Sequence, residues 1–111
     1  SAEDLAEQFS NAQMPLLALT AIVGAPFAEE IFFRGLMQGS IERTSRSWVA
    51  VVVVALVFAG SHFQWPELVP LVVVGLCAGV VVARTGRLST AIALHMGFNA
   101  VGVALLVLDR L

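Results

Sequence analysis

Long apolar stretches alternate with short polar segments along the whole chain. Apolar side chains dominate residues 14 to about 41, 48–63, 68–83 and 88–108, and the segments between them are polar or charged. A helix of about 20 apolar residues crosses the hydrocarbon core of a bilayer. Because lipid offers the backbone no hydrogen-bond partners, spanning segments of this kind form helices. The pattern therefore predicts an all-α, polytopic transmembrane helical bundle with about four spans.

Two of the predicted spans have irregular features. Pro26 interrupts the first span, and a proline inside a helix removes a backbone hydrogen bond, so we expect this span to be kinked at Pro26. The second span is short for a bilayer crossing unless it continues past His62. Its run of valines could also form a buried strand in a soluble protein.

The composition favours a membrane protein. Hydrophobic residues make up 59% of the 111 positions and charged residues 13%, whereas about a quarter of a typical soluble domain is charged. The mean hydropathy is +0.90. The net charge of −2 is too small to indicate a nucleic-acid partner or an acidic substrate. The single Cys77 excludes a disulfide within these residues, and we expect it to pack inertly.

The arginines predict how the bundle is oriented. Consecutive spans alternate in direction, so the loops around residues 42–47 and 84–87 lie on the same side of the membrane. These two loops hold four of the six basic residues: Arg43, Arg46, Arg84 and Arg87. The positive-inside rule places them in the cytoplasm. We expect a multi-pass protein of the cell membrane, with residues 1–111 forming a single membrane-embedded domain of a longer chain.

Two pairs of glycines are spaced four residues apart within the predicted spans. Gly35 and Gly39 form one pair, and Gly75 and Gly79 form the other. Small residues at this spacing share one helix face and let two helix backbones approach closely. We expect both pairs to pack inside the bundle, and the alternative is that they have no special role.

Several polar side chains lie at bilayer depth, where each of them needs a partner or a wet cavity. They are Glu29, Glu30, Arg34, His62, His95 and Asn99. Glu30 and Arg34 are four residues apart and can form an ion pair, which we expect to be a supporting one. Glu29 is rotated by about 100° from Glu30 and points elsewhere. His95 and Asn99 share one helix face, and Phe58 and His62 share another.

The depths of these side chains indicate one shared site. At about 1.5 Å per residue from the arginine-rich side, His62 lies about 21 Å deep, Glu29 about 18 Å, Asn99 about 16 Å and His95 about 10 Å. A carboxylate with a neighbouring imidazole can activate water as a general base, and imidazole and amide groups can stabilise an oxyanion. The set therefore predicts hydrolysis of an amide bond. Ser61 points about 100° away from His62, so no covalent nucleophile is evident.

At these residues the sequence resembles the family of CAAX proteases and bacteriocin-processing enzymes, which are intramembrane endopeptidases. The family motifs Glu-Glu-x-x-x-Arg, Phe-x-x-x-His and His-x-x-x-Asn are matched, in that order, by residues 29–34, 58–62 and 95–99. The resemblance implies that Glu29 activates water with help from His62, and that His95 and Asn99 stabilise the oxyanion. It also implies that Glu30 and Arg34 hold the first helix in shape, while Phe58 packs beside His62.

The expected function is cleavage of a peptide bond in a membrane-associated peptide or protein, and lipid is the other expected partner. We expect no cofactor. The alternative is zinc held by Glu29, His62 and His95, which are suitable ligands, whereas Asn99 is a poor one. Two other functions stay open. One is a non-catalytic immunity or scaffolding protein that binds a partner through the same polar cluster, and the other is an ion or proton pathway.

Overall fold

A continuous helix forms the first third of the molecule. The computed structural model describes Ser10 and residues 12–111. The helix runs from Met14 to Glu42. Its consecutive segments are α2 (Met14–Leu19), the π-helix η1 (Thr20–Gly24), α3 (Ala25–Glu30), the π-helix η2 (Ile31–Gln38) and α4 (Gly39–Glu42). The helix continues through Pro26, which lies in the first turn of α3 directly after the π-helical turn. A π-helical turn there accommodates the missing N–H of the proline.

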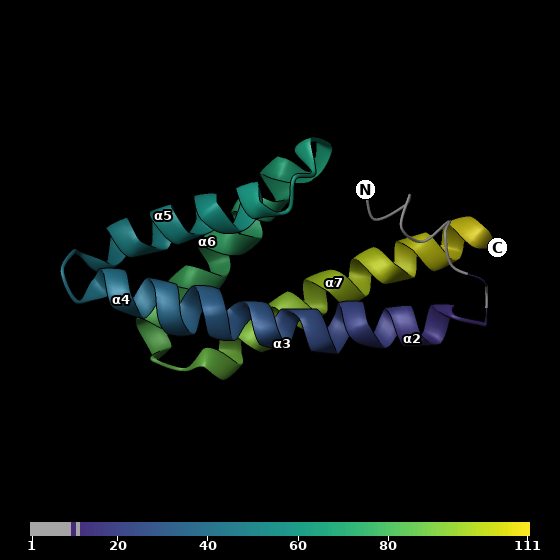
Figure 1. Ribbon diagram of the computed structural model, residues 1–111, viewed down its shortest axis with the longest axis horizontal. Coiled ribbons are helices and arrows are strands. Elements are labelled where there is room, and N and C mark those ends of the chain that lie inside the picture. Colours follow the sequence, from purple (N-terminus) through teal and green to yellow (C-terminus); the bar gives the residue numbers. More distant parts are fainter. Residues whose placement is uncertain (1–9, 11) are drawn as a thin grey trace.

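Three more helices follow in an alternating, antiparallel order (Figure 1). They are α5 (Ser47–Ser61), α6 (Leu68–Thr85) and α7 (Leu88–Arg110), with the short 3-10 helix η3 (Trp65–Glu67) between α5 and α6. The chain turns after α6 at Gly86, whose φ of 66° suits a residue without a Cβ. No strand occurs in residues 12–111. The predicted all-α fold is confirmed.

The second apolar segment ends earlier than the hydrophobic pattern predicts. Helix α5 ends at Ser61. The N–H groups of His62 and Phe63 donate to the carbonyls three residues back, those of Ala59 and Gly60, instead of continuing the four-residue pattern of an α-helix. Phe63 then adopts a φ of 51°, which breaks the helix. The 15 residues of α5 rise about 22 Å, less than the ~30 Å hydrocarbon core. The other three helices, Met14–Glu42, Trp65–Thr85 and Leu88–Arg110, are long and apolar enough to span a membrane.

The arginine-rich loops lie together at one end of the bundle, and η3 and the C-terminus lie toward the other (Figure 1). Helix α5 packs on α6 and on η2, while α7 packs on α3, η1 and α6. The hydrophobic core fills the space between these helices and includes Phe33, Val54, Phe58, Leu71 and Val74. Cys77, which we expected to pack inertly, is exposed on the surface of α6.

The two glycine pairs behave differently. A Cβ on Gly75 would lie 3.1 Å from the Cα of Ala55, and one on Gly79 would lie 3.0 Å from a methyl group of Val51. These glycines therefore let α6 approach α5 closely, as small residues do between membrane helices. A Cβ on Gly35 would make only ordinary contact, at 3.7 Å, and one on Gly39 would meet nothing within 4 Å. The expectation of close packing is therefore wrong for the first pair.

Candidate active site

The side chains of Glu29, His62 and His95 lie close together, although they come from α3, from the residue after α5 and from α7. One carboxylate oxygen of Glu29 lies 3.7 Å from Nε2 of His62, and the other lies 3.4 Å from Nε2 of His95. The Glu29 side chain is 31% exposed and that of His62 is 23% exposed, whereas that of His95 is buried at 2%. The acid therefore sits between two imidazole rings at the edge of the packed interior.

The end of helix α5 fixes the orientation of His62. The carbonyl of Phe58 lies near the helix terminus, where the last carbonyls lack their intrahelical N–H partners. Nδ1 of His62 lies 2.7 Å from this oxygen, and the hydroxyl of Ser61 donates to the same oxygen at 2.8 Å. Because a carbonyl only accepts, Nδ1 carries the proton in this contact. In the neutral ring Nε2 then presents a lone pair toward Glu29.

Glu30 fixes the orientation of His95. Nδ1 of His95 lies 2.8 Å from Oε2 of Glu30, and the same oxygen accepts a hydrogen bond from Nη1 of Arg34 at 2.9 Å. All three side chains are buried. An acid that orients an imidazole through Nδ1 leaves Nε2 for the reacting groups, as in other catalytic arrangements of carboxylate and histidine. Glu30 thus contacts His95, a residue of the site, in addition to pairing with Arg34 in its own helix.

Arg34 is held by a neighbouring helix as well as by Glu30. Its Nη2 donates to the carbonyl of Gly75 in α6 at 2.8 Å. Its guanidinium carbon lies 4.6 Å from the centre of the Phe58 ring, which is a favourable cation–π position. The same ring makes edge contacts with His62 and His95, at centroid distances of 4.7 and 5.4 Å. Phe58 therefore packs against both imidazoles.

Gln38 is a buried polar residue that the sequence analysis missed. Its Nε2 donates to the carbonyl of Gly79 at 3.1 Å, one helical turn beyond the bond from Arg34 to Gly75. The residues Glu30, Arg34 and Gln38 are spaced by four and are all buried. The signal that could have revealed Gln38 is this spacing. A four-residue repeat falls between the 3.6-residue turn of an α-helix and the wider turn of a π-helix, so the mixed helix keeps these residues on one face.

Asn99 is tied to the first helix. Its Nδ2 donates to the carbonyl of Ala21 at 2.8 Å. In the π register of η1, the N–H of Ala25 bonds to the carbonyl of Thr20, five residues back. The next donor in that register would be Pro26, which has no N–H, so the Ala21 carbonyl lacks its backbone partner. Asn99 supplies this partner with one N–H of its amide and keeps the other for a further acceptor.

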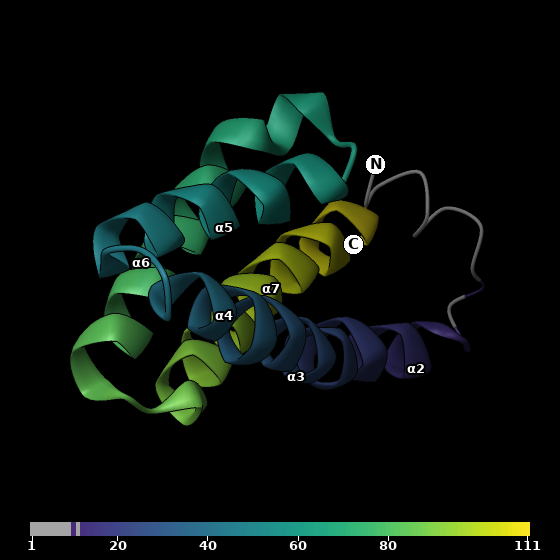
Figure 2. The same cartoon turned by 60° about the vertical axis from the view of Figure 1, so that its left-hand side comes forward.

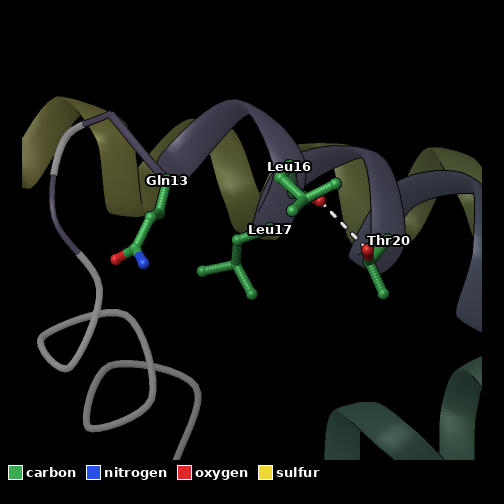
Figure 3. Close-up of a pocket in the computed structure, with 4 residues that line it drawn as sticks. All are labelled: Gln13, Leu16, Leu17 and Thr20. Atoms are coloured by element: carbon green, nitrogen blue, oxygen red, sulfur yellow. Dashed lines mark hydrogen bonds between the residues drawn. The ribbon is translucent and has the colours of Figure 1, made fainter.

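A shallow apolar pocket of about 230 Å³ lies elsewhere on the surface (Figure 3). Gln13, Leu16, Leu17 and Thr20 line it, all from the start of the first helix. None of these residues bonds to the polar cluster around Glu29, so the pocket is separate from the candidate site. Within the described part of the chain, no group of three or more His, Cys, Asp or Glu side chains is arranged to hold a metal ion.

The fold and the buried cluster define a polytopic membrane protein with an acid between two histidines. Residues 11–101 match the family model described as type II CAAX prenyl endopeptidase Rce1-like. The chain belongs to this family, and the family match confirms the resemblance that the three motifs indicated.

A relative from Escherichia coli, described as an uncharacterized 24.3 kDa protein, is 30% identical over 103 residues. The similarity covers 86% of this chain and 48% of the relative, so the chain spans about half the length of that protein. No solved structure matches the chain.

Proposed function

We propose that this chain carries the catalytic centre of an intramembrane endopeptidase that cleaves a peptide bond with activated water. The observation that supports the proposal most strongly is the position of Glu29. Its two carboxylate oxygens face Nε2 of His62 and Nε2 of His95, which come from two other helices. A carboxylate at bilayer depth is costly unless it is paired or faces a wet cavity. A carboxylate placed between two imidazoles at this depth is therefore a candidate for proton transfer.

The nucleophilic water binds between Glu29 and His62. Both facing atoms are hydrogen-bond acceptors when Nδ1 of His62 donates to the Phe58 carbonyl, and they lie 3.7 Å apart. Two acceptors at that distance repel each other directly but accept the two hydrogens of one bridging water. The water then presents a lone pair to the carbonyl carbon of the substrate. Glu29 takes a proton from the water as the carbon–oxygen bond forms, which is general base catalysis.

His95 and Asn99 stabilise the negative oxygen that forms on the substrate. In this proposal the His95 ring carries both protons during the reaction, with Nδ1–H directed at Oε2 of Glu30. Nε2 of His95 and the second N–H of the Asn99 amide then donate to the oxyanion. Collapse of the intermediate breaks the carbon–nitrogen bond, and Glu29 returns its proton to the leaving amine. The other product is the new peptide end as a carboxylic acid, whose remaining water proton passes to the amine, so that a carboxylate and an ammonium are released.

The proposed reaction uses no metal. Glu29, His62 and His95 would be suitable zinc ligands, so a chelator distinguishes the two mechanisms. We expect activity of the purified full-length protein to survive chelation. Loss of activity that zinc restores would replace the water mechanism proposed here with metal catalysis.

The decisive experiment measures cleavage of a peptide library by the purified full-length protein and its Glu29→Gln variant. Because Glu29→Gln removes the base but keeps the size of the side chain, we expect loss of cleavage with unchanged thermal unfolding. Glu67→Gln, an acid in η3 outside the cluster, is the matched control and should cleave normally. Cleavage by the Glu29→Gln variant at the normal rate would reject the proposal. A cellular phenotype that survives Glu29→Gln would favour a partner-binding role instead.

A further inference from the structure

Helix α6 packs against the candidate site although it supplies none of the motif residues. Its 18 residues include no acid, histidine or asparagine. Figure 2 shows α6 beside α5, on which it packs. At Gly75 the two helices approach so closely that an added Cβ would lie 3.1 Å from the Cα of Ala55 and 3.2 Å from Cδ1 of Phe58. Only a residue without a side chain therefore lets α6 lie this near the Phe58 ring.

The Phe58 ring connects Gly75 to both imidazoles. The ring is completely buried, and its edge contacts reach His62 at 4.7 Å and His95 at 5.4 Å between centroids. The ring of Phe33 is a further close neighbour, at 5.4 Å. Because a packed interior offers a displaced ring no free space, a push on Phe58 from α6 changes its contacts with the imidazoles.

A hydrogen-bonded chain provides a second connection, from Gly75 to His95. The Gly75 carbonyl accepts from Nη2 of Arg34 at 2.8 Å, and Nη1 of Arg34 donates to Oε2 of Glu30 at 2.9 Å. The same oxygen of Glu30 lies 2.8 Å from Nδ1 of His95. The guanidinium of Arg34 also lies 4.6 Å from the centre of the Phe58 ring, so the two connections share a contact. A shift of α6 at Gly75 would therefore disturb His95 through both of them.

We infer that Gly75 is a positioning residue for the proposed reaction. Because it has no side chain, it seats the Phe58 ring and the Arg34 guanidinium, and these in turn set the directions of the two imidazoles around Glu29. In this role Gly75 acts through other side chains and contacts no reacting group itself. The inference rests on the proposed function for the reaction that it serves. The competing outcome is a glycine that serves packing alone, whose substitution lowers stability and leaves the site unchanged.

Gly79, one turn further along α6, provides the matched control. A Cβ there would lie 3.0 Å from a methyl group of Val51 and 3.1 Å from Oε1 of Gln38, so Gly79→Ala crowds the surface of α6 as closely as Gly75→Ala does. Its carbonyl likewise accepts a side-chain hydrogen bond, from Nε2 of Gln38 at 3.1 Å. Among the described residues, no hydrogen bond or ring contact joins Val51 or Gln38 to either histidine. The two substitutions therefore differ in what they displace.

Peptide cleavage by the purified full-length protein provides the first test. Both Gly75→Ala and Gly79→Ala should lower the unfolding temperature, because each overpacks a close helix contact. A Cβ at Gly75 displaces its neighbours by a few tenths of an ångström. Since a misplacement of about 1 Å can cost about 100-fold in rate, we expect kcat of Gly75→Ala to fall about three- to tenfold with little change in KM. Gly79→Ala should keep the kcat and KM of the wild type. Equal kcat values for the two variants, or a loss that appears only in KM, would overturn the inference.

The NMR signals of the imidazoles provide a readout that does not depend on cleavage. The 111 residues contain two histidines, and both belong to the site. Histidine labelled with carbon-13 gives a ring signal for each, assigned in the full-length protein by its loss in His62→Gln or His95→Gln. Because an aromatic ring shifts the signals of nuclei beside it, a displaced Phe58 ring should move both signals in Gly75→Ala and neither in Gly79→Ala. Unchanged signals in Gly75→Ala, or equal shifts in both variants, would overturn the inference.

A double variant covers the case in which Gly75→Ala does not fold. Ala55→Gly removes the methyl group that would lie 3.2 Å from the new Cβ, and it keeps the equally short contact with Phe58. Gly75→Ala combined with Ala55→Gly should therefore show the same fall in kcat and the same shifts of the imidazole signals, and wild-type values would overturn the inference. If the wild type cleaves no peptide, the proposed function fails, while the imidazole signals still decide whether Gly75 positions the histidines.

Discussion

The two adjacent glutamates should respond in opposite ways to the same substitution. Glu30 is completely buried, and its Oε2 accepts hydrogen bonds from Arg34 and His95 at 2.9 and 2.8 Å. In Glu30→Gln, the guanidinium of Arg34 loses its counter-charge while it stays buried. Removing one partner of a buried ion pair costs about 3–5 kcal/mol, because the remaining charge is left without compensation. We expect a loss at the lower end, about 3 kcal/mol, since Arg34 keeps its bond to the Gly75 carbonyl.

Glu29→Gln provides the matched comparison. The Glu29 carboxylate is 31% exposed and makes only the longer contacts to the two imidazoles, at 3.4 and 3.7 Å. Partly exposed ion pairs contribute about 0–1 kcal/mol, so this variant should unfold close to the wild type. Glu29→Gln should therefore lose activity and keep stability, whereas Glu30→Gln should lose stability and, through a misoriented His95, part of its activity.

Reversible unfolding in detergent micelles, followed for both variants and the wild type, measures the difference in free energy. Peptide cleavage is measured well below the unfolding temperature of the weaker variant, so that loss of fold does not imitate loss of chemistry. Equal destabilisation by the two substitutions would contradict the assignment of Glu30 to the buried pair. A Glu30→Gln variant with normal stability and normal activity would refute the role of Glu30 altogether.

Three further substitutions test the packing around the site. Gly79→Ala should destabilise the protein by about 1–3 kcal/mol through overpacking, whereas Gly39→Ala should be tolerated; equal unfolding free energies would contradict this contrast. Asn99→Leu should cost about 1 kcal/mol of stability, because the Ala21 carbonyl loses its donor, and should also lower kcat; a change in neither unfolding nor kcat would reject both roles. Phe58→Leu should lower kcat more than it raises KM, since the lost ring orients both imidazoles rather than contacting substrate; a pure rise in KM would contradict that reading.

The fold could be predicted because lipid makes the hydrophobic pattern almost decisive. Apolar stretches of spanning length have few alternatives to helices, and the structure has a helix in each of the four predicted places. The end of α5 could not be predicted in the same way. The predicted helix ran through Phe63, but the backbone turns at His62 and Phe63, and hydropathy does not fix the residue at which a helix ends.

The polar residues of the site could be found from the sequence, but their partners could only partly be found. The four-residue spacing correctly indicated contact between Glu30 and Arg34. It gave no indication that Glu30 also contacts His95, because that contact joins two helices and depends on how far each helix is rotated. The π-helical turns of η1 and η2 change this rotation, and their positions are not visible in a pattern read at 3.6 residues per turn. The burial of Gln38 was missed because a helix read at 3.6 residues per turn does not keep Gln38 on the face of Glu30 and Arg34, whereas the mixed helix does.

The two adjacent acids of the motif, Glu29 and Glu30, have different surroundings. Adjacent helical residues differ in direction by about 100°, so two neighbouring carboxylates cannot face the same surroundings. Glu30 points into the packed interior, where its Oε2 contacts both Arg34 and His95. Glu29 points to the edge of that interior, where its side chain is 31% exposed and lies between the two imidazoles, and the proposed mechanism makes it the group that takes up and releases a proton. One residue of separation thus places one carboxylate inside the packed interior and the other at its edge. Because the two side chains are chemically identical, the different role that we propose for each depends on its surroundings.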